Sequence, residues 1–245
     1  VNEKIEEQGL PYKAKDLPQY KGNSKKLNPD VVVKRDGEKY ISFELKTSAG
    51  ADFGQFQVAT PDFDEDGLTI GDIDHKDIDH PKTEGSNRDV EMISQIGSKT
   101  LVKAFNKVYP ALIKDEECMI KLRNLAGLQA ADTEDSEAAY RKLVDSADLK
   151  RVPVEDIGQL TTAYYLEKGV DFLVINDMLY AMSPLAQEMN IPGVKTLVEA
   201  ATSGIVRARI KCHGKTYSAT GALKITKIED SVKFNEPDIF NALFP

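Results

Sequence analysis

Three charged side chains in the segment NPDVVVKRDGEKYISFELK, residues 28–46, have the types and spacing of a catalytic group. Asp30 precedes three valines, and Glu44 and Lys46 stand two residues apart in a later alternating run. Two carboxylates placed side by side repel each other, so such a pair implies a shared proton or a hard cation such as Mg²⁺. A cation held in this way can polarise a phosphate and activate water, and a nearby ammonium group can stabilise developing charge. The combination suits hydrolysis of a phosphodiester.

Two strands must position these residues. Val31 to Lys34 is β-branched, Tyr40 to Leu45 alternates, and Asp36-Gly37 between them is a turn signal, so the segment predicts a hairpin. Side chains alternate along a strand, which separates the second strand into a polar and an apolar face. The polar face carries Ser42, Glu44 and Lys46, and the apolar face carries Ile41, Phe43 and Leu45.

The register of the hairpin decides whether Asp30 joins the polar face. A two-residue turn with an uninterrupted ladder sets Asp30 opposite Phe43 and directs it to the core side. A bulge, or a loop of odd length, sets Asp30 opposite Glu44, and the valines then meet Phe43 and Ile41 on one apolar face. The hydrophobic pattern favours this second register. Cross-strand Cβ atoms are about 5 Å apart, so Asp30 and Glu44 could then hold one cation.

Pro29-Asp30, followed after thirteen residues by Glu44-Leu45-Lys46, resembles the motif of the PD-(D/E)xK nuclease superfamily. Members include restriction enzymes, phage and recombination exonucleases, and junction resolvases. The resemblance implies Asp30 and Glu44 as ligands of Mg²⁺, with Mn²⁺ as a substitute, and Lys46 as the catalytic lysine. It also implies a restriction-endonuclease-like core, which is a mixed central sheet flanked by helices, and DNA as the substrate.

Some branches of this superfamily carry further residues, and the resemblance extends to them only within residues 1–60. A glutamine on the element after the lysine strand would correspond to Gln55 or Gln57. An upstream helical glutamate would correspond to one of three candidates, Glu3, Glu6 and Glu7.

Two other interpretations of the motif compete with this one. Pro61-Asp62, followed after eleven residues by Asp74-His75-Lys76, fits the same letters, but its Asp- and Gly-rich surroundings lack strand patterns. An ordinary structural hairpin, in which Glu44 and Lys46 form a surface ion pair, requires no chemistry at all.

The order of patterns along the 245 residues is β-rich, helical and β-rich, which predicts an α/β (α+β) fold. We expect one domain with four parts: a catalytic hairpin region (1–60), an acidic loop (61–88), a helical insertion (89–169) and a β-rich C-terminal part (170–245). The expected helices are a short N-terminal one and the segments 51–59, 90–108, 111–131, 134–147, 154–168 and 195–201. Strands are expected over 170–175 and 179–182, and a long C-terminal β-hairpin over 205–228 turns near His213-Gly214.

Charge is distributed unevenly. From Asp62 to Glu91 acidic side chains outnumber basic ones by eight, which equals the net charge of −8 of the whole chain. Within this segment Asp62, Asp64 and Asp66 with Gly67 match the first half of a calcium loop, but the second half departs from that pattern. A solvated acidic loop is the alternative. His75 and His80 lie among aspartates, but their spacing fits no standard zinc site.

Basic residues outnumber acidic ones by five from Ile205 to Lys233. Arg207, Arg209 and Lys211 alternate with apolar residues and therefore share one strand face, which predicts contacts to nucleic-acid phosphates. An edge strand protected from aggregation by charge is an equally good interpretation.

The remaining features bound the class of protein. No apolar run reaches the roughly 18 residues of a spanning helix, and no signal peptide is visible, so we expect a cytoplasmic protein that does not enter a membrane. Cys118 and Cys212 have no metal-type spacing and are expected to be reduced thiols. Cutting of two DNA strands, in endonuclease rather than exonuclease fashion, would favour a homodimer. The competing class is a non-catalytic binding or assembly protein whose acidic loop binds Ca²⁺ or a basic partner.

Overall fold

The computed structural model describes residues 2–16, 29–48, 50–59, 62–64, 67–69, 150–154, 156–213 and 216–245, with positions 71, 102, 103 and 106. The helices expected over 90–108, 111–131 and 134–147, and most of the acidic loop, lie outside these residues apart from the isolated positions. Among the described residues, no helix has both the length and the apolar character required to cross a bilayer.

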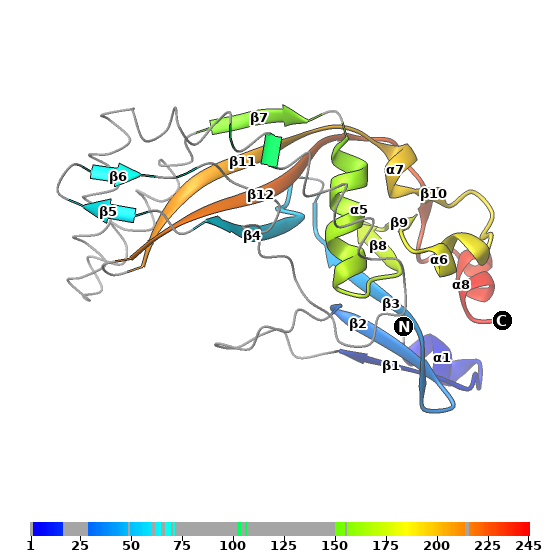
Figure 1. The fold of residues 1–245 in the computed structure, drawn as a ribbon. Helices are drawn as coiled ribbons and strands as arrows, with labels where there is room; N and C mark the ends of the chain where they lie inside the picture. Colours follow the sequence, from blue (N-terminus) through cyan, green and yellow to red (C-terminus); the bar gives the residue numbers. More distant parts are fainter. Residues whose placement is uncertain are drawn as a thin grey trace, which may run out of the picture.

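A seven-stranded mixed sheet contains the predicted hairpin (Figure 1). Strand β3 is antiparallel to β2 but parallel to β8, and β8 is antiparallel to β9, so the prediction of a mixed sheet is confirmed. The strand order is β1-β2-β3-β8-β9-β10, with β13 also paired to β9. The bounds are β1 Tyr12–Asp16, β2 Val31–Arg35, β3 Glu38–Lys46, β8 Phe172–Ile175, β9 Met178–Ala181, β10 Lys195–Thr196 and β13 Val232–Lys233.

A β-bulge sets the register between β2 and β3. The two strands start from a two-residue turn, since Arg35 lies opposite Glu38, but the ladder shifts by one residue between Val33 and Lys34. Tyr40 is the extra residue in β3, because Lys39 pairs with Lys34 and Ile41 pairs with Val33. The register that follows, with Val31 opposite Phe43, is the one that the hydrophobic pattern predicts.

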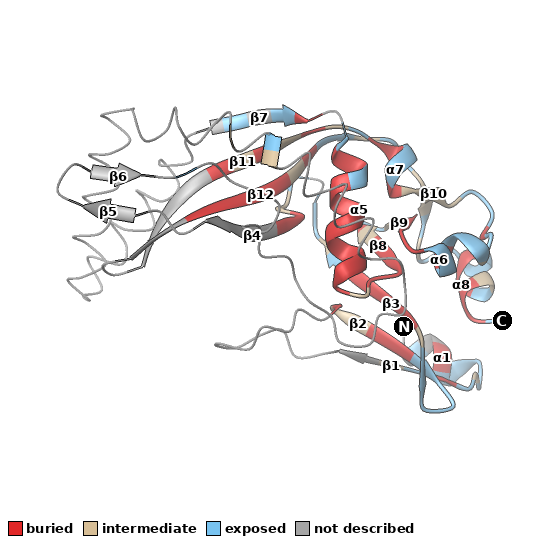
Figure 2. Ribbon diagram, in the orientation of Figure 1, coloured by how far each residue is buried: buried red, intermediate tan, exposed pale blue. Residues whose placement is uncertain are grey.

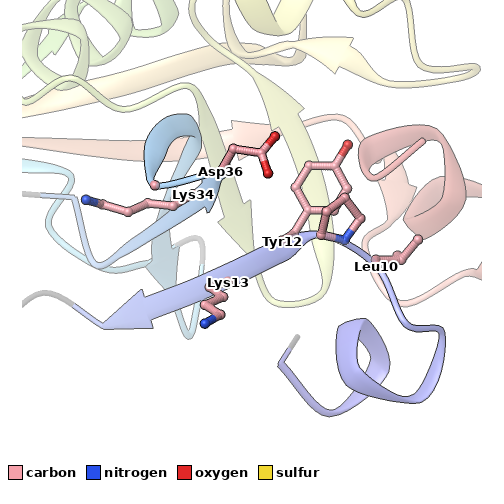
Figure 3. A pocket seen from close by; sticks show the side chains of 7 residues that line it. Leu10, Tyr12, Lys13, Lys34 and Asp36 are labelled. Atoms are coloured by element: carbon pink, nitrogen blue, oxygen red, sulfur yellow. The ribbon is translucent and has the colours of Figure 1, made fainter.

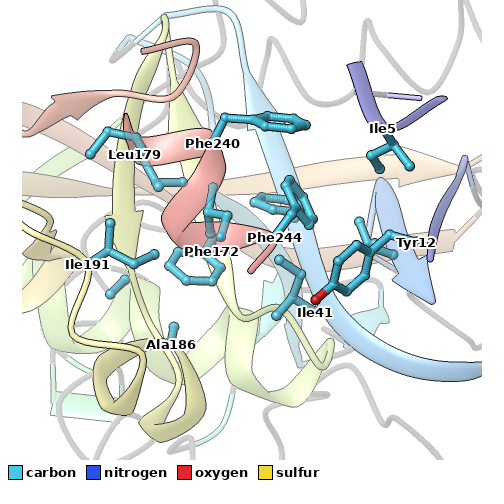
Figure 4. Close-up of a cluster of buried hydrophobic side chains, with 14 residues drawn as sticks. Ile5, Tyr12, Ile41, Phe172, Leu179, Ala186, Ile191, Phe240 and Phe244 are labelled. Carbon is cyan, nitrogen blue, oxygen red and sulfur yellow. The ribbon is translucent and has the colours of Figure 1, made fainter. Parts of the chain in front are cut away.

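The apolar face of this sheet packs against three short helices. These are α1 (Asn2–Glu7), α6 (Pro184–Glu188) and α8 (Pro237–Leu243), which contribute Ile5, Ala186 and Phe240 to one buried cluster (Figure 4). Aromatic rings fill the centre, where Phe43 stacks on Phe172 with ring centroids 5.6 Å apart. Burial of this apolar surface is the main driving force for the layer.

The second sheet is antiparallel and is formed mainly by the long C-terminal hairpin, in the order β4-β12-β11-β7. The predicted hairpin is confirmed, with β11 (Ala201–His213) paired along its whole length to β12 (Thr216–Ile228). The edge strands are β4 (Gly54–Ala59) and β7 (Lys150–Val154). A separate two-stranded sheet joins β5 (Asp62–Asp64) to β6 (Gly67–Thr69).

Helix α5 (Ile157–Glu167) lies between the two sheets and is buried along almost its whole length (Figures 1 and 2). Its first turn packs on β11, where Gly204 leaves room for Ile157, and its last turns cover the polar face of β3. Gly54 of β4 similarly makes room for the ring of Tyr164. A short helix, α7 (Leu197–Ala200), contacts the start of α5 and begins with a capping box formed by Thr196 and Glu199.

Two sequence predictions are wrong. The segment 51–59 is not a helix, because residues 54–59 form β4 and pair with β12. The helix expected over 154–168 starts at Ile157, because Lys150–Val154 is a strand. Pro153 lies in β7, an edge strand of the second sheet, where a residue without a backbone N–H is tolerated.

The close approach of α5 to the second sheet gives a prediction. We expect Gly204→Ala to destabilise the protein by about 1–3 kcal/mol, because the added Cβ would overlap Ile157 and lie 2.7 Å from the carbonyl oxygen of Lys224. Gly50→Ala is the control, since among the described residues its Cβ would meet only the Ser48 hydroxyl, at 3.8 Å. Urea-induced unfolding measures both, and equal stability of the two variants would contradict the prediction.

Candidate active site

Glu44 is the centre of the candidate site. Its side chain is only 3% exposed, although it is charged and lies near the end of β3. One carboxylate oxygen, Oε1, is 3.0 Å from Lys46 Nζ, and the other, Oε2, accepts a hydrogen bond of 2.7 Å from Lys168 Nζ. Each carboxylate oxygen therefore faces an ammonium group. Glu44 does pair with Lys46, but the pair is not at the surface, because the carboxylate is buried.

Asp30 lies immediately beyond the last paired residues of β2 and β3. Its Oδ2 accepts a hydrogen bond of 2.8 Å from the backbone N–H of Leu45, and this bond continues the contact between the strands after the pair Val31 and Phe43. Because side chains alternate along β2, Asp30 lies on the same face as Val32. Val32 is paired with Ser42, and Ser42 shares its face with Glu44, so Asp30 and Glu44 lie on the same face of the sheet. The bulged register thus brings Asp30, Glu44 and Lys46 to one face.

Tyr165 of α5 lies over this group of charges. The Nζ atoms of Lys46 and Lys168 are 5.8 and 5.1 Å from the centroid of its ring, within the range of cation–π contacts. Burial raises the pKa of the Tyr165 phenol well above its usual value, and the negative charges of Glu44, Asp30 and Asp52 raise this pKa further. Three carboxylates therefore lie near one buried hydroxyl.

Lys168 is the residue that sequence reasoning missed. It follows the last residue of α5, and Gly169 after it has a φ of +72°, a left-handed conformation that ends the helix. A lysine at a helix C-terminus is favourable with the helix dipole alone, so its position carried no specific signal. Only the packing of α5 against β3 reveals that its ammonium group reaches Glu44.

A buried hydrogen-bond network fixes the strand that carries Glu44. Asp171 is fully buried, and its Oδ2 accepts hydrogen bonds from the backbone N–H and the hydroxyl of Ser42, at 3.1 and 2.9 Å. Its Oδ1 accepts a bond of 2.7 Å from Ser183, and Lys39 supplies a positive charge at 3.1 Å from Oδ2. Because a buried carboxylate without partners is costly, this network holds β3 against the loops around β8 and β9.

The other resemblance-based candidates lie on other elements. Gln55 and Gln57 lie in β4, the strand that follows β3 in the chain, and pair there with Ala222 and Thr220 of β12; their part in the site stays a prediction. Helix α1 packs through Ile5 into the apolar cluster, on the face of the sheet opposite to Glu44. The helical glutamates are exposed there, so the prediction of an upstream glutamate in the site is wrong for Glu3, Glu6 and Glu7.

The other predicted sites are described only in part. Asp62 and Asp64 lie in β5, which forms a hairpin with β6, while Asp66, His75 and His80 lie outside the described residues. No group of three or more His, Cys, Asp or Glu side chains suited to a metal occurs within the described part of the chain. A calcium site in the acidic segment stays a prediction.

The basic row of the C-terminal hairpin is also only partly described. Arg207, Arg209 and Lys211 occupy alternate positions of β11, which lies between β12 and β7 over Gly204–Ala208. The interpretation of a charged edge strand is therefore wrong for Arg207; it stays a prediction for Arg209 and Lys211, which lie beyond the described pairing with β7. Arg207 donates a hydrogen bond of 3.1 Å to Asp52, so this cation has a structural partner; the side chains of Arg209 and Lys211 lie outside the description.

Comparisons with protein-family models, curated proteins and solved structures give no match to this chain. The resemblance to PD-(D/E)xK nucleases therefore rests on the sequence motif of residues 29–46 and stays a prediction.

Removal of Lys168 tests the buried charge cluster. We expect Lys168→Met to destabilise the protein by about 2 kcal/mol, because Glu44 loses one of two ammonium partners while the apolar stem is retained. The same substitution should cost less in a Glu44→Gln background, as a double-mutant cycle by urea unfolding would measure. Lys195→Met is the control, because its ion pair with Glu229 is exposed to solvent and should contribute no measurable stability. An equal cost of Lys168→Met in both backgrounds would contradict the coupling.

The raised pKa of Tyr165 predicts that this residue gives no tyrosinate absorbance in the folded protein at a pH where exposed tyrosines do. At about pH 10.5 an exposed tyrosine is largely ionised, but Tyr165 should remain protonated in the folded protein. Native wild type and Tyr165→Phe should therefore show equal tyrosinate absorbance, while in urea the wild type should show one tyrosinate more. Because the pKa is higher in the folded state, this group's contribution to stability is present below about pH 10 and falls as the pH rises further. Lower native absorbance in Tyr165→Phe would refute the assignment.

Proposed function

We propose that this protein is a metal-dependent nuclease that hydrolyses phosphodiester bonds of DNA. The observation that carries the proposal is the bulged register of β2 and β3, which brings Asp30, Glu44 and Lys46 to one face. The register matters because the letters of the motif are common, whereas a straight ladder would direct Asp30 to the apolar cluster.

The residues present fit a hard divalent cation. Asp30 and Glu44 offer carboxylate oxygens, and Mg²⁺ is commonly held by one or two carboxylates while it keeps several water ligands. Glu44 is 3% exposed and already requires positive charge, which Lys46 and Lys168 supply in this structure. Asp30 and Glu44 would hold Mg²⁺, or Mn²⁺ in its place, and the cation would supply Lewis-acid activation of the phosphate and of a bound water.

The chain's own residues orient and stabilise the reacting groups. Lys46 is 21% exposed, more than Glu44, so its ammonium group can face a phosphate that approaches from solvent. A fixed ammonium at this place stabilises the negative charge that develops on the phosphate oxygens. Lys168 and the ring of Tyr165 close the inner side of the cluster and hold the Glu44 carboxylate in one orientation.

The proposal includes a cellular setting and an assembly. Cys118 and Cys212, which lack metal-type spacing, are consistent with reduced thiols in the cytoplasm. An endonuclease that cuts both strands would use a two-fold dimer, because the strands of a duplex are themselves related by two-fold symmetry.

The decisive experiment is cleavage of plasmid and linear DNA in Mg²⁺ by the wild type and by variants of the site. We expect Lys46→Ala, Asp30→Asn and Glu44→Gln each to lower the rate by about 10²-fold or more, since each removes charge stabilisation of the transition state. Chelation of the metal should abolish cleavage. Lys195→Ala, on the exposed ion pair with Glu229, should cut like the wild type.

Two outcomes would remove the proposal: no cleavage by the wild type, or equal cleavage by the wild type and Lys46→Ala. Circular dichroism of each variant separates loss of the site from loss of the fold. Absence of cleavage would favour the competing class, a binding or assembly protein.

A further inference from the structure

Three lysines lie in register across the edge of the first sheet. Lys13 of β1 is directly opposite Lys34 of β2, and Lys34 is directly opposite Lys39 of β3. Directly opposed residues of neighbouring strands point to the same face, so the three side chains leave the sheet on one face and their Cα positions form a row across the strands. We call Lys13, Lys34 and Lys39 the lysine row.

Among the described residues, only Lys39 of the lysine row has a carboxylate partner. Lys39 lies 3.1 Å from the buried carboxylate of Asp171 and donates a hydrogen bond to the carbonyl of Gly169. Lys13 and Lys34 are exposed, and neither forms an ion pair with another described residue. Like charges placed directly opposite each other are unfavourable. A bound anion would relieve this repulsion.

The lysine row lies on the same face as the candidate active site. Strand β2 has an unbroken alternation from Asp30 to Lys34, because the extra residue of the bulge belongs to β3. Four residues at about 3.3 Å each separate Lys34 from Asp30 by about 13 Å. A nucleic-acid strand whose reacting phosphate lies at Asp30 can therefore reach Lys34 with a phosphate only a few nucleotides away.

The surface at the exposed end of the row is hollowed. Lys13 and Lys34 line a depression of about 410 Å³ together with Tyr12, Asp36 and neighbouring residues (Figure 3). Asp36 is the acidic group on this surface, but it is 84% exposed and its carboxylate lies 4.0 Å from Arg35. The wider segment from Tyr12 to Arg35 contains seven basic and two acidic side chains.

We propose that Lys13 and Lys34 bind backbone phosphates of a nucleic-acid strand whose reacting phosphate lies at Asp30 and Glu44. The inference deepens the proposed function, on which it rests, by assigning a binding surface for the substrate a few nucleotides from the reacting bond. Contacts of this kind recognise the phosphate backbone and are independent of base sequence.

Binding without metal tests this surface apart from cleavage. The affinity for a short labelled DNA duplex is measured by fluorescence anisotropy, in the presence of a chelator and over a series of salt concentrations. For Lys13→Gln/Lys34→Gln we expect the affinity at low salt to be lower than that of the wild type by about tenfold or more. The slope of log affinity against log salt should be smaller in magnitude by about two. The control Lys227→Gln/Lys233→Gln removes the same charge from exposed positions of β12 and β13 and should bind like the wild type.

The outcomes separate this inference from the proposed function. Equal binding by the wild type and the Lys13 and Lys34 variant, or equal weakening by the control, overturns the lysine row even if the protein cuts DNA. Weaker binding and a smaller salt slope in that variant, but not in the control, support the lysine row. This holds even if the wild type cuts no DNA, a result that would remove the proposed function but not the binding surface. No binding of DNA by the wild type overturns the row.

Discussion

The constraint on which the site depends is the burial of one negative charge. The carboxylate of Glu44 is almost completely removed from water, and such a group is tolerated only with positive partners and a fixed geometry. Its two lysines come from different elements, one from β3 itself and one from the end of α5. The charge requirement therefore ties the first sheet to α5, and the packing of α5 on β11 extends this connection to the second sheet.

The hairpin could be predicted in detail because its information is local. Alternating side chains from Ile41 to Lys46 and the valines before them admit one register with a single apolar face, and that register requires an additional residue. The structure contains this residue as Tyr40. The long C-terminal hairpin was predictable for the same reason, since apolar residues alternate with basic ones before His213-Gly214 and mainly with hydroxyl-bearing ones after it.

The elements that were missed depend on distant partners. Residues 54–59 form a strand because β12, more than 150 residues later in the chain, provides its ladder, and the alternation of Gln55, Phe56 and Gln57 is a short signal. Lys168 belongs to the site only because α5 crosses β3, which no local pattern specifies. The side of the sheet on which α1 packs likewise follows from the cluster around Ile5 and not from its own sequence.

Tyr40 links the two ends of the chain. The bulge residue contacts the ring of Tyr12 at 4.9 Å and donates a hydrogen bond from its hydroxyl to the carbonyl of Leu243 in α8, 203 positions away. During synthesis the hairpin leaves the ribosome long before α8 exists, so this anchor is missing when β2 and β3 first meet. Such non-local contacts form slowly. We therefore expect the local pattern to set the register of Asp30 and Glu44 first, and the anchor of the bulge residue on α8 to form later in folding.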